Sequence, residues 1–327
     1  MVVRMESMPI AAETVEFSVE LADRITRSVC EAMSDSRAAV EAALTTLFAG
    51  GHLLIEDVPG VGKTTLAAAL GRSIDATVRR LQFTSDMLPA DVTGLSIYHQ
   101  DTHEFTFHPG PIFSNIVIGD EINRATPKTQ SALLEAMAER AVTMDGATRQ
   151  LPELFLVVAT QNPGDMEGTF PLPEAQRDRF MARISLGYPA AAAEIAMLER
   201  RSHRDPVGAI TPVASVEDVL RAQRAVNEIH LSAAAASYLV AIVTATRTHP
   251  ALALGASPRA SLHLARMARA RALLLGRTYV TAEDIAQLAT PVLAHRLLPL
   301  GYFEGQRDAA AAVKEIMAEV LASTRLE

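Results

Sequence analysis

The sequence has a single cysteine, Cys30, among its 327 residues. One thiol cannot form a disulfide within the chain, so this scarcity fits a protein of a reducing compartment. Long apolar runs are also missing, and no stretch is long enough to cross a bilayer as a helix. The opening "MVVRMESMPIAAETVEF" lacks a basic segment followed by an apolar block. We therefore predict no secretion signal and expect a cytoplasmic protein.

Basic residues are also few. The 30 Lys and Arg are outnumbered by 38 Asp and Glu, which gives a net charge of −8. Nucleic-acid-binding proteins usually carry broad basic surfaces that pair with phosphates. The composition therefore disfavours a chain that grips nucleic acid over a wide area.

Short apolar runs alternate with helix-forming segments over the first 189 residues. Runs such as "HLLIED", "SNIVIGD" and "FLVVATQNP" are typical of buried strands in parallel sheets. The segments "LSIYHQDTHEFTFHPG" and "AVTMDGATRQL" alternate and turn as β-hairpins do. Helical spacing covers residues 14–48 and nearly all of residues 190–327. We predict an α/β core over residues 1–189, with a short N-terminal helical segment, and an all-helical lid over residues 190–327.

The stretch "LLIEDVPGVGKTTLAAAL" ends like a phosphate-binding loop. Gly60 and Gly62 allow the backbone to approach phosphates, and the loop opens onto a helix N-terminus, which attracts anions. Lys63 is placed to neutralise the β- and γ-phosphates, and the Thr64 hydroxyl to ligate Mg²⁺. The predicted nucleotide-binding residues are Val58, Pro59, Gly60, Val61, Gly62, Lys63, Thr64 and Thr65.

Asp57 stands where the phosphate-loop pattern has its first glycine. That glycine mainly permits an unusual backbone turn, and Asp is among the few other residues that tolerate one. Pro59 stiffens the loop. We interpret Asp57 as a tolerated variant, and expect its replacement by glycine to change nucleotide affinity by less than about threefold.

Polar residues follow two other predicted strands where each strand ends. In "IVIGDEINRA", Asp120 suits Mg²⁺ bound through water, and Glu121 suits a base that polarises the attacking water. In "VVATQNP", Asn162 is placed to hold that water in line. Alone, such residues are typical of solvated strand ends and turns. Beside a phosphate loop they indicate an ATPase, because ligands bind at the carboxyl ends of parallel strands.

Together these motifs resemble the MoxR family of AAA+ ATPases from about residue 35 to about residue 300. The resemblance is carried by the stretches "AGGHLLIEDVPGVGKTTLA", "RRLQFTSDMLPADVTG", "DEINRATPKTQSALLEAMAER", "ATQNP", "LPEAQRDRF" and "GASPRASLHLARMARA". It implies a P-loop AAA+ core with a parallel sheet and inserted β-hairpins, followed by the helical lid. It also implies ATP and Mg²⁺ as cofactors and hydrolysis of ATP to ADP and phosphate.

The same resemblance implies partners. Proteins of this family work as homo-oligomeric rings, commonly hexamers, that remodel or mature other proteins in a chaperone-like way. It further implies a protein client or adaptor, such as one with a von Willebrand factor A domain.

The resemblance also implies roles for two arginines that the residues alone would not reveal. Arg179 in "RDRF" matches the arginine finger, which reaches the γ-phosphate in the neighbouring subunit. Arg259 in "SPRA" matches the sensor-2 arginine of the lid, and it stays open whether it serves its own nucleotide or a neighbour's. Arg177 stands where the family has an apolar residue and is a second candidate for the finger, although Arg179 is favoured.

The turn near the adenine also departs from the family pattern. Asp35 and Ser36 stand where the family has a Val-Gly-Gln-like turn, which leaves the base contacts open.

Two other functions compete with protein remodelling. An AAA+ motor on nucleic acid needs Lys or Arg on its hairpins to follow phosphates. The segment from Leu81 to Asn123 has neither, and the second hairpin offers only Arg149. A nucleotide-gated scaffold without turnover would have no use for Glu121.

The first hairpin holds the histidines His99, His103 and His108, which we interpret as exposed residues rather than metal ligands.

Overall fold

A computed structural model describes residues 10–33, 36–162, 168–191, 194–195, 207–303 and 305–325. Asp35 and the first nine residues of the predicted N-terminal segment lie outside the described residues.

Five parallel strands form one sheet at the centre of the fold, in the order β2-β5-β8-β1-β9. The strands are β1 (Leu53–Glu56), β2 (Val78–Gln82), β5 (Ile116–Asp120), β8 (Leu156–Gln161) and β9 (Ala182–Ile184). Every residue of β5 and β8 is buried, which explains why these segments are apolar runs rather than alternating ones. Because all five strands run the same way, their carboxyl ends meet at one edge of the sheet.

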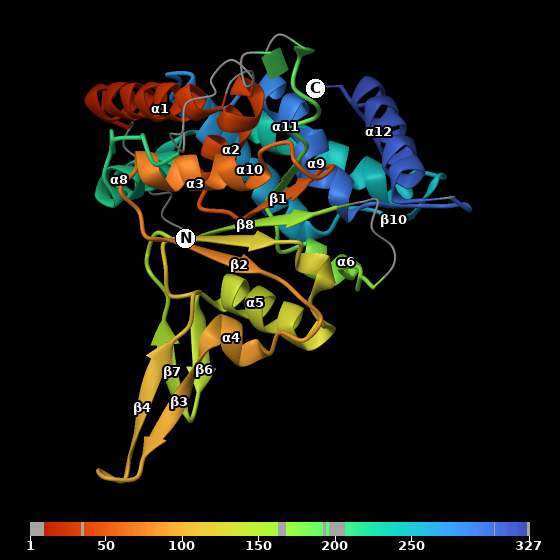
Figure 1. The fold of residues 1–327 in the computed structure, drawn as a ribbon. Coiled ribbons are helices and arrows are strands. Elements are labelled where there is room, and N and C mark those ends of the chain that lie inside the picture. The colour runs from red at the N-terminus through yellow and green to blue at the C-terminus, as the bar shows by residue number, and fades with distance from the viewer. Residues whose placement is uncertain are drawn as a thin grey trace, which may run out of the picture.

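The two faces of the sheet are covered by different helices (Figure 1). The helices that precede the lid are α1 (Ala12–Ala32), α2 (Arg37–Phe48), α3 (Lys63–Ser73), α4 (Pro89–Thr93), the short η1 (Ile122–Arg124), α5 (Pro127–Glu139) and α6 (Glu174–Arg177). Ile116 and Ile118 of β5 pack with residues of α1, α2 and α3, whereas Val117 between them packs with residues of α5. Successive side chains of a strand alternate between its faces, so one strand serves both cores.

Two β-hairpins project side by side from one end of the molecule, away from the sheet (Figure 1). They are β3 (Gly94–His99) with β4 (Glu104–Pro109), and β6 (Ala141–Met144) with β7 (Ala147–Gln150). In the second hairpin, Asp145 and Gly146 both have positive φ, as a two-residue turn of this kind requires. Ser96 donates a hydrogen bond to Asp145 and so joins the two hairpins. Both predicted hairpins are present.

In the described part of the lid, the labelled helices are α8 (Val216–Glu228), α9 (Ala233–Thr248), α10 (Pro258–Leu274), α11 (Ala282–Leu293), η2 (Ala294–Arg296) and α12 (Gln306–Ser323). Four of them begin at a Ser or Thr whose hydroxyl accepts a hydrogen bond from the N–H three residues on. The sequence did not predict the two-stranded antiparallel ladder between β10 (Leu252–Leu254) and β11 (Leu298–Pro299). Within the described ranges, no helix has the length and apolar character needed to cross a membrane.

His52 joins three elements of the core just before β1. Its Nδ1 accepts a hydrogen bond from the Val157 N–H at 3.0 Å, so its Nε2 carries the proton and donates to the Met137 carbonyl at 3.3 Å. Burial lowers the pKa of His52 to about 4. A second buried histidine, His295, donates through Nε2 to the Phe180 carbonyl, and burial also lowers its pKa well below the usual value.

Because the pKa values of these histidines are lowered, we expect the protein to lose stability in mild acid. The unfolded chain binds a proton near the ordinary histidine pKa, whereas the folded chain does so only at lower pH, so stability falls as the pH falls from about 6.5 towards 4. Each such histidine contributes a slope of about 1.4 kcal/mol per pH unit within that window. Urea unfolding between pH 7.5 and 5 should give a shallower pH dependence for His52→Gln than for the parent chain. If the pH dependence of the unfolding free energy is the same in both proteins, His52 does not contribute to it and this prediction is wrong.

Candidate functional site

The phosphate-binding loop lies at the carboxyl end of β1 and leads directly into α3. Gly60 and Gly62 have φ of 84° and 92°, in the left-handed region that favours glycine. The side chain of Lys63 turns back to the strand ends, where Nζ donates to the carbonyls of Asp57 at 2.7 Å and Gln161 at 3.4 Å. Burial lowers the pKa of Lys63, opposed by the carboxylates around it. The loop therefore offers a half-buried ammonium group to an anion.

Thr64 and Asp120 meet next to this loop. The Thr64 hydroxyl lies 3.1 Å from both carboxylate oxygens of Asp120, which is 5% exposed. A hydroxyl and a carboxylate supply the hard oxygen ligands that Mg²⁺ requires, so the residues fit the predicted metal site. The sequence reading missed two further contacts of this carboxylate. Arg80 of β2 forms an ion pair with it at 2.6 Å, and Thr160 of β8 donates to it at 3.2 Å.

Glu121 follows β5 in a strained conformation. Its φ is 57°, which is uncommon for a residue with a side chain and typical of functional positions. Its N–H donates to the Thr160 hydroxyl at 3.1 Å, so Thr160 forms hydrogen bonds with both Asp120 and Glu121. The Glu121 carboxylate accepts from Gln82 and pairs with Arg124, each at 3.0 Å. Asn162 directly follows β8 at the same edge of the sheet.

Asp57 does not supply the unusual backbone turn that we expected of it from the sequence. It is absent from the described residues with positive φ, and its N–H extends the pairing of β1 with β8 by donating to the Gln161 carbonyl. Its carboxylate is buried and accepts four hydrogen bonds, from the N–H groups of Val58, Leu186 and Gly187 and from the Ser185 hydroxyl, at 2.7 to 2.8 Å. Burial alone would raise the pKa of Asp57, but these hydrogen bonds hold it below its usual value. Asp57 is thus a tie between the phosphate loop and the segment after β9.

The tied segment forms one wall of a cavity of about 200 Å³ beside the loop. The lining residues come from the end of α1, the phosphate loop and the segment after β9, namely Ala32, Met33, Ser36, Gly60, Val61, Gly62, Thr65, Leu186, Gly187, Tyr188 and Pro189. Such a position, next to a phosphate loop, is suited to the base of a nucleotide.

A second cavity, of about 190 Å³, collects cationic side chains. Arg179 and Arg259 both line it, together with Arg140 and Arg266, and no carboxylate does. The Arg179 guanidinium donates to the Leu134 carbonyl of α5. Within the described part of the chain, no hydrogen bond or ion pair engages the guanidinium of Arg259. Arg177, the second candidate for the finger, lines a different cavity with Glu56 and Arg183.

The two sites lie at opposite ends of the same strands. The arginine cavity includes Gly50, Gly51 and His52, which precede β1, whereas the phosphate loop follows it. Four residues at ~3.3 Å each separate the two ends by about 13 Å. The structure therefore gathers Lys63, Thr64, Asp120, Glu121 and Asn162 at one edge of the sheet. It gathers Arg179 and Arg259 at the other.

A phosphate loop at the carboxyl edge of a parallel sheet, followed by a helical lid, defines a P-loop protein of the AAA+ class. The family described as ATPase family associated with various cellular activities (AAA) matches residues 52–182, and the AAA lid domain matches residues 244–316. The chain is 40% identical to a protein of Mycobacterium tuberculosis (strain ATCC 25618 / H37Rv) named Chaperone MoxR1, over 90% of this chain and 80% of that protein.

Two further relatives agree. The chain is 50% identical to the uncharacterised protein YeaC of Bacillus subtilis (strain 168), over 85% of this chain and 87% of that one. The crystal structure of a candidate ATPase from Cytophaga hutchinsonii ATCC 33406 aligns with a TM-score of 0.87 at 34% identity, covering 96% of this chain and 97% of that chain. The chain belongs to the MoxR family of AAA+ ATPases.

The contacts of Asp57 reverse the expectation that glycine could replace it. Hydrogen bonds to a charged group contribute about 1.5–3 kcal/mol each, and about 1.4 kcal/mol is tenfold in affinity. Asp57→Gly removes four such hydrogen bonds and releases the segment after β9, which forms one wall of the cavity beside the phosphate loop. ADP affinity measured by titration calorimetry should therefore fall by more than about tenfold. Asp75→Gly is the matched control, because Asp75 is exposed with a φ of 50° that glycine adopts readily. A loss below threefold at Asp57 would restore the first interpretation.

Proposed function

We propose that this protein hydrolyses ATP at a site shared by two copies of the chain, in a homo-oligomeric ring that remodels or matures a partner protein. The observation that carries the proposal is the separation of the Arg179–Arg259 cavity from the phosphate loop along β1. A closed ring of copies places the cavity of one subunit against the loop of the next. The hexamer, common in the family, is the ring size we expect. The division into a core of residues 1–189 and a lid of residues 190–327 belongs to the same proposal.

Each residue at the loop edge has a part in the reaction. Lys63 and the loop backbone bind the phosphates, and Glu121 polarises the water that attacks the γ-phosphate. Asn162 holds that water in line. Thr64 and Asp120 would hold Mg²⁺, which when bound neutralises charge on the phosphate oxygens. The hydrogen bonds of Glu121 to Gln82 and Thr160 orient the base before ATP arrives.

Both arginines are proposed to act on the neighbour's nucleotide. A cavity lined by arginines without a carboxylate is complementary to an anion, and phosphates are the anions of this reaction. Arg259 shares this cavity with Arg179, so the same neighbour supplies the ligand of both. We therefore propose that Arg259 acts in trans, the alternative that the sequence left open.

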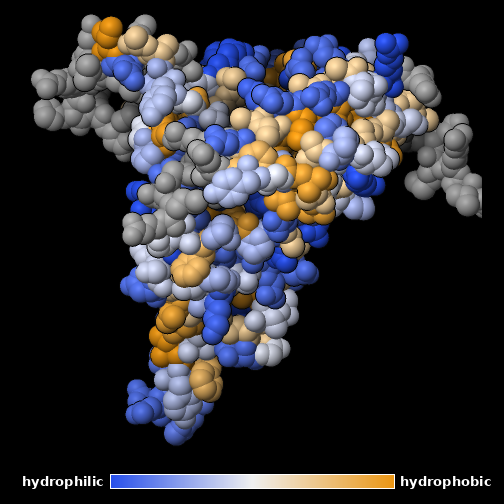
Figure 2. All heavy atoms as spheres, turned by 90° about the vertical axis from the view of Figure 1, so that its right-hand side faces the viewer, coloured by the Kyte–Doolittle hydropathy of each residue, from blue (hydrophilic) through white to orange (hydrophobic). Residues whose placement is uncertain are grey.

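The projecting hairpins favour a protein client over nucleic acid. Leu95, Ile97 and Phe105 are exposed on the first hairpin, and Figure 2 shows hydrophobic patches on the narrow end of the molecule. Arg149, the cation of the second hairpin, lies 4.0 Å from the Phe107 ring centroid and donates to the Met144 and Ala147 carbonyls. Its charge is thus used in packing rather than offered to phosphates. A client or adaptor with a von Willebrand factor A domain, met in the cytoplasm, remains our proposal from the family resemblance.

Loss of the base should separate ATP binding from hydrolysis. Glu121→Gln keeps the size of the side chain but cannot accept a proton, so we expect ATP binding with Mg²⁺ and hydrolysis at least ~100-fold slower. Glu135→Gln, an exposed position of α5, is the matched control. Steady-state phosphate release measures turnover, with and without single-stranded DNA. Near-normal turnover would remove Glu121 from the mechanism, and strong stimulation by DNA would favour the nucleic-acid motor.

Mixed rings test the shared site. Arg179→Ala should bind ATP but hydrolyse it poorly, because a finger supplied in trans contributes a factor of roughly 10³ to 10⁵. Lys63→Ala should fail at its own phosphates while it still carries Arg179. Mixing the two inactive variants places an intact loop beside an intact finger, so part of the activity should return. Arg259→Ala should be rescued by Lys63→Ala in the same way.

Two outcomes would contradict the shared site. If mixed rings form but no activity returns, Arg179 acts within its own subunit or not at all. If Arg177→Ala rather than Arg179→Ala abolishes turnover, the finger is Arg177.

A further inference from the structure

A buried arginine outside the nucleotide site joins the lid to the core. Arg296, at the end of η2, is 3% exposed, and Nε forms an ion pair with Asp178 at 2.7 Å. Nη2 donates to the carbonyls of Phe180 at 2.6 Å and Asp178 at 3.3 Å, and Nη1 donates to Val292. Burial lowers the pKa of Arg296, and Asp178 opposes that shift. A guanidinium so enclosed fixes the geometry of whatever it binds.

The core groups that Arg296 binds lie on both sides of Arg179 in the chain. Asp178 precedes Arg179 and Phe180 follows it, and Phe180 is fully buried. His295, beside Arg296, donates to the same Phe180 carbonyl at 3.2 Å. The backbone of Arg179 is thus held by the lid at both neighbouring residues. Its side chain leaves this segment towards the arginine cavity.

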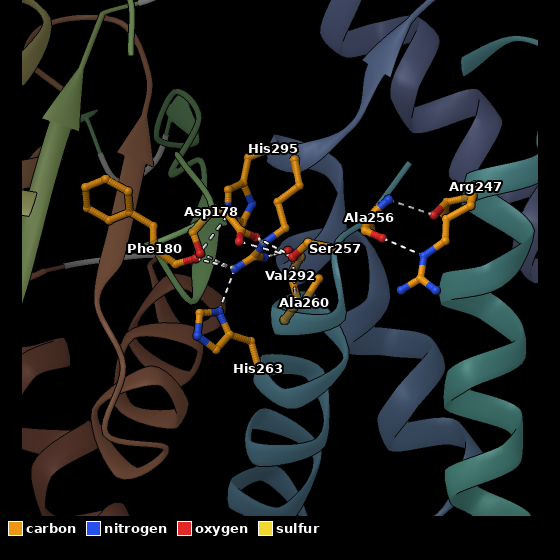
Figure 3. A network of polar contacts seen from close by, with 11 residues as sticks. Asp178, Phe180, Arg247, Ala256, Ser257, Ala260, His263, Val292 and His295 are labelled. Carbon is orange, nitrogen blue, oxygen red and sulfur yellow. Dashed lines mark hydrogen bonds and ion pairs between the residues drawn. The ribbon is translucent and has the colours of Figure 1, made fainter. Parts of the chain in front are cut away.

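The carboxylate of Asp178 also binds the helix that carries Arg259. The Ser257 hydroxyl donates to both Asp178 oxygens, at 3.0 and 3.1 Å, and accepts from the Ala260 N–H as the N-cap of α10. One turn after Arg259, His263 accepts a hydrogen bond from Arg296 through Nδ1 at 2.6 Å. Figure 3 shows Asp178 and Phe180 on one side facing Ser257 and His263 of α10 on the other.

We infer that the Asp178–Arg296 ion pair is a positioning unit, which holds Arg179 and Arg259 in one fixed relation so that both reach the neighbour's phosphates together. Neither Asp178 nor Arg296 lines the arginine cavity, so the pair acts through the segments that it fixes. The inference rests on the proposed function, since it requires that the two arginines act in trans. A further consequence is that any displacement of the lid displaces Arg179 as well, because Arg296 belongs to the lid and binds Asp178 and Phe180 on either side of Arg179.

Activity in mixed rings shows whether breaking the Asp178–Arg296 ion pair impairs the finger or the phosphate loop. Asp178→Asn removes the charge and keeps an acceptor for Ser257, and Arg296→Lys keeps the charge and loses the fork. A catalytic group misplaced by about 1 Å can lose about 10²-fold in rate, so we expect hydrolysis to fall by that order while ADP affinity at the subunit's own loop stays within about twofold. Mixing either variant with Lys63→Ala should restore activity. Mixing it with Arg179→Ala should not, because both then lack a working finger.

Asp284→Asn is the matched control for a loss of stability alone. Asp284 is 1% exposed and pairs with Arg277 at 2.6 and 2.7 Å, within the lid and without contact to the segment around Arg179. Its variant should lower the unfolding temperature as the broken Asp178 pair does, yet keep turnover per folded ring. Unfolding temperature and ring formation are measured for every variant. If Asp178→Asn does not fold, Arg296→Lys decides the question.

Each outcome has a defined meaning. Rescue by Lys63→Ala but not by Arg179→Ala supports the positioning unit. If Arg179→Ala and Lys63→Ala rescue each other but the Asp178 and Arg296 variants hydrolyse ATP like Asp284→Asn, the pair only fastens the lid and this inference is wrong. If Arg179→Ala and Lys63→Ala fail to rescue each other in mixed rings, the shared site itself is wrong and the inference falls with it.

Discussion

The parallel pairing of β1 with β9 is the constraint on which the rest of the site depends. Leu53 lies opposite Ala182 and Ile55 opposite Ile184, so the two strands begin together and β1 continues for one residue beyond β9. At one end, the Met181 N–H donates to the His52 carbonyl, which places Arg179 beside the start of β1. At the other end, Asp57 accepts from Leu186 and Gly187. Contacts at the two ends of this strand pair therefore locate both the phosphate loop and Arg179.

Buried charge adds to the apolar cluster that the core and the lid share, and attaches the lid to the segment around Arg179. Removing water from Arg296 is unfavourable, but Asp178, three carbonyls and His263 replace it. Breaking one member of a buried ion pair typically costs on the order of 3–5 kcal/mol, because the remaining charge stays desolvated. An apolar contact would hold the lid as firmly but with less directional precision. The fork of Arg296 specifies orientation as well as attachment.

The sequence predicted the fold well, and the positions of the loop-edge residues in that fold follow from the same local rules. Apolar runs identified β1, β5 and β8, and the Asp145–Gly146 turn identified the second hairpin. Lys63 and Thr64 begin α3 after the loop that follows β1, and Asp120 ends β5, so their meeting follows from the parallel sheet. Arg179 and Arg259 entered only through the family resemblance, since a surface arginine has no local signal.

What the sequence missed was set by contacts between distant segments. Asp57 resembled a turn residue because the pattern compares it with glycine, while three of the four partners of its carboxylate lie some 130 residues away, at Ser185 to Gly187. Arg80 reaches Asp120 from a neighbouring strand, and Thr160 from another. The Asp178–Arg296 pair spans the core and the lid. None of these pairings has a spacing that periodicity could detect.

The shortness of β9 has a consequence for how this chain can vary. Three residues at ~3.3 Å each make a spacer of about 10 Å between the segment of Arg179 at one end and the hydrogen bonds to Asp57 at the other. One inserted or deleted residue would turn the alternate side chains of β9 to the wrong face, and would shift one end relative to the other. The β3–β4 turn, by contrast, projects into solvent and can change length without altering either end of β9. Relatives and engineered versions of this protein should therefore differ in length at the hairpin tips and keep the length of β9, which fixes the distance between Arg179 and the phosphate loop.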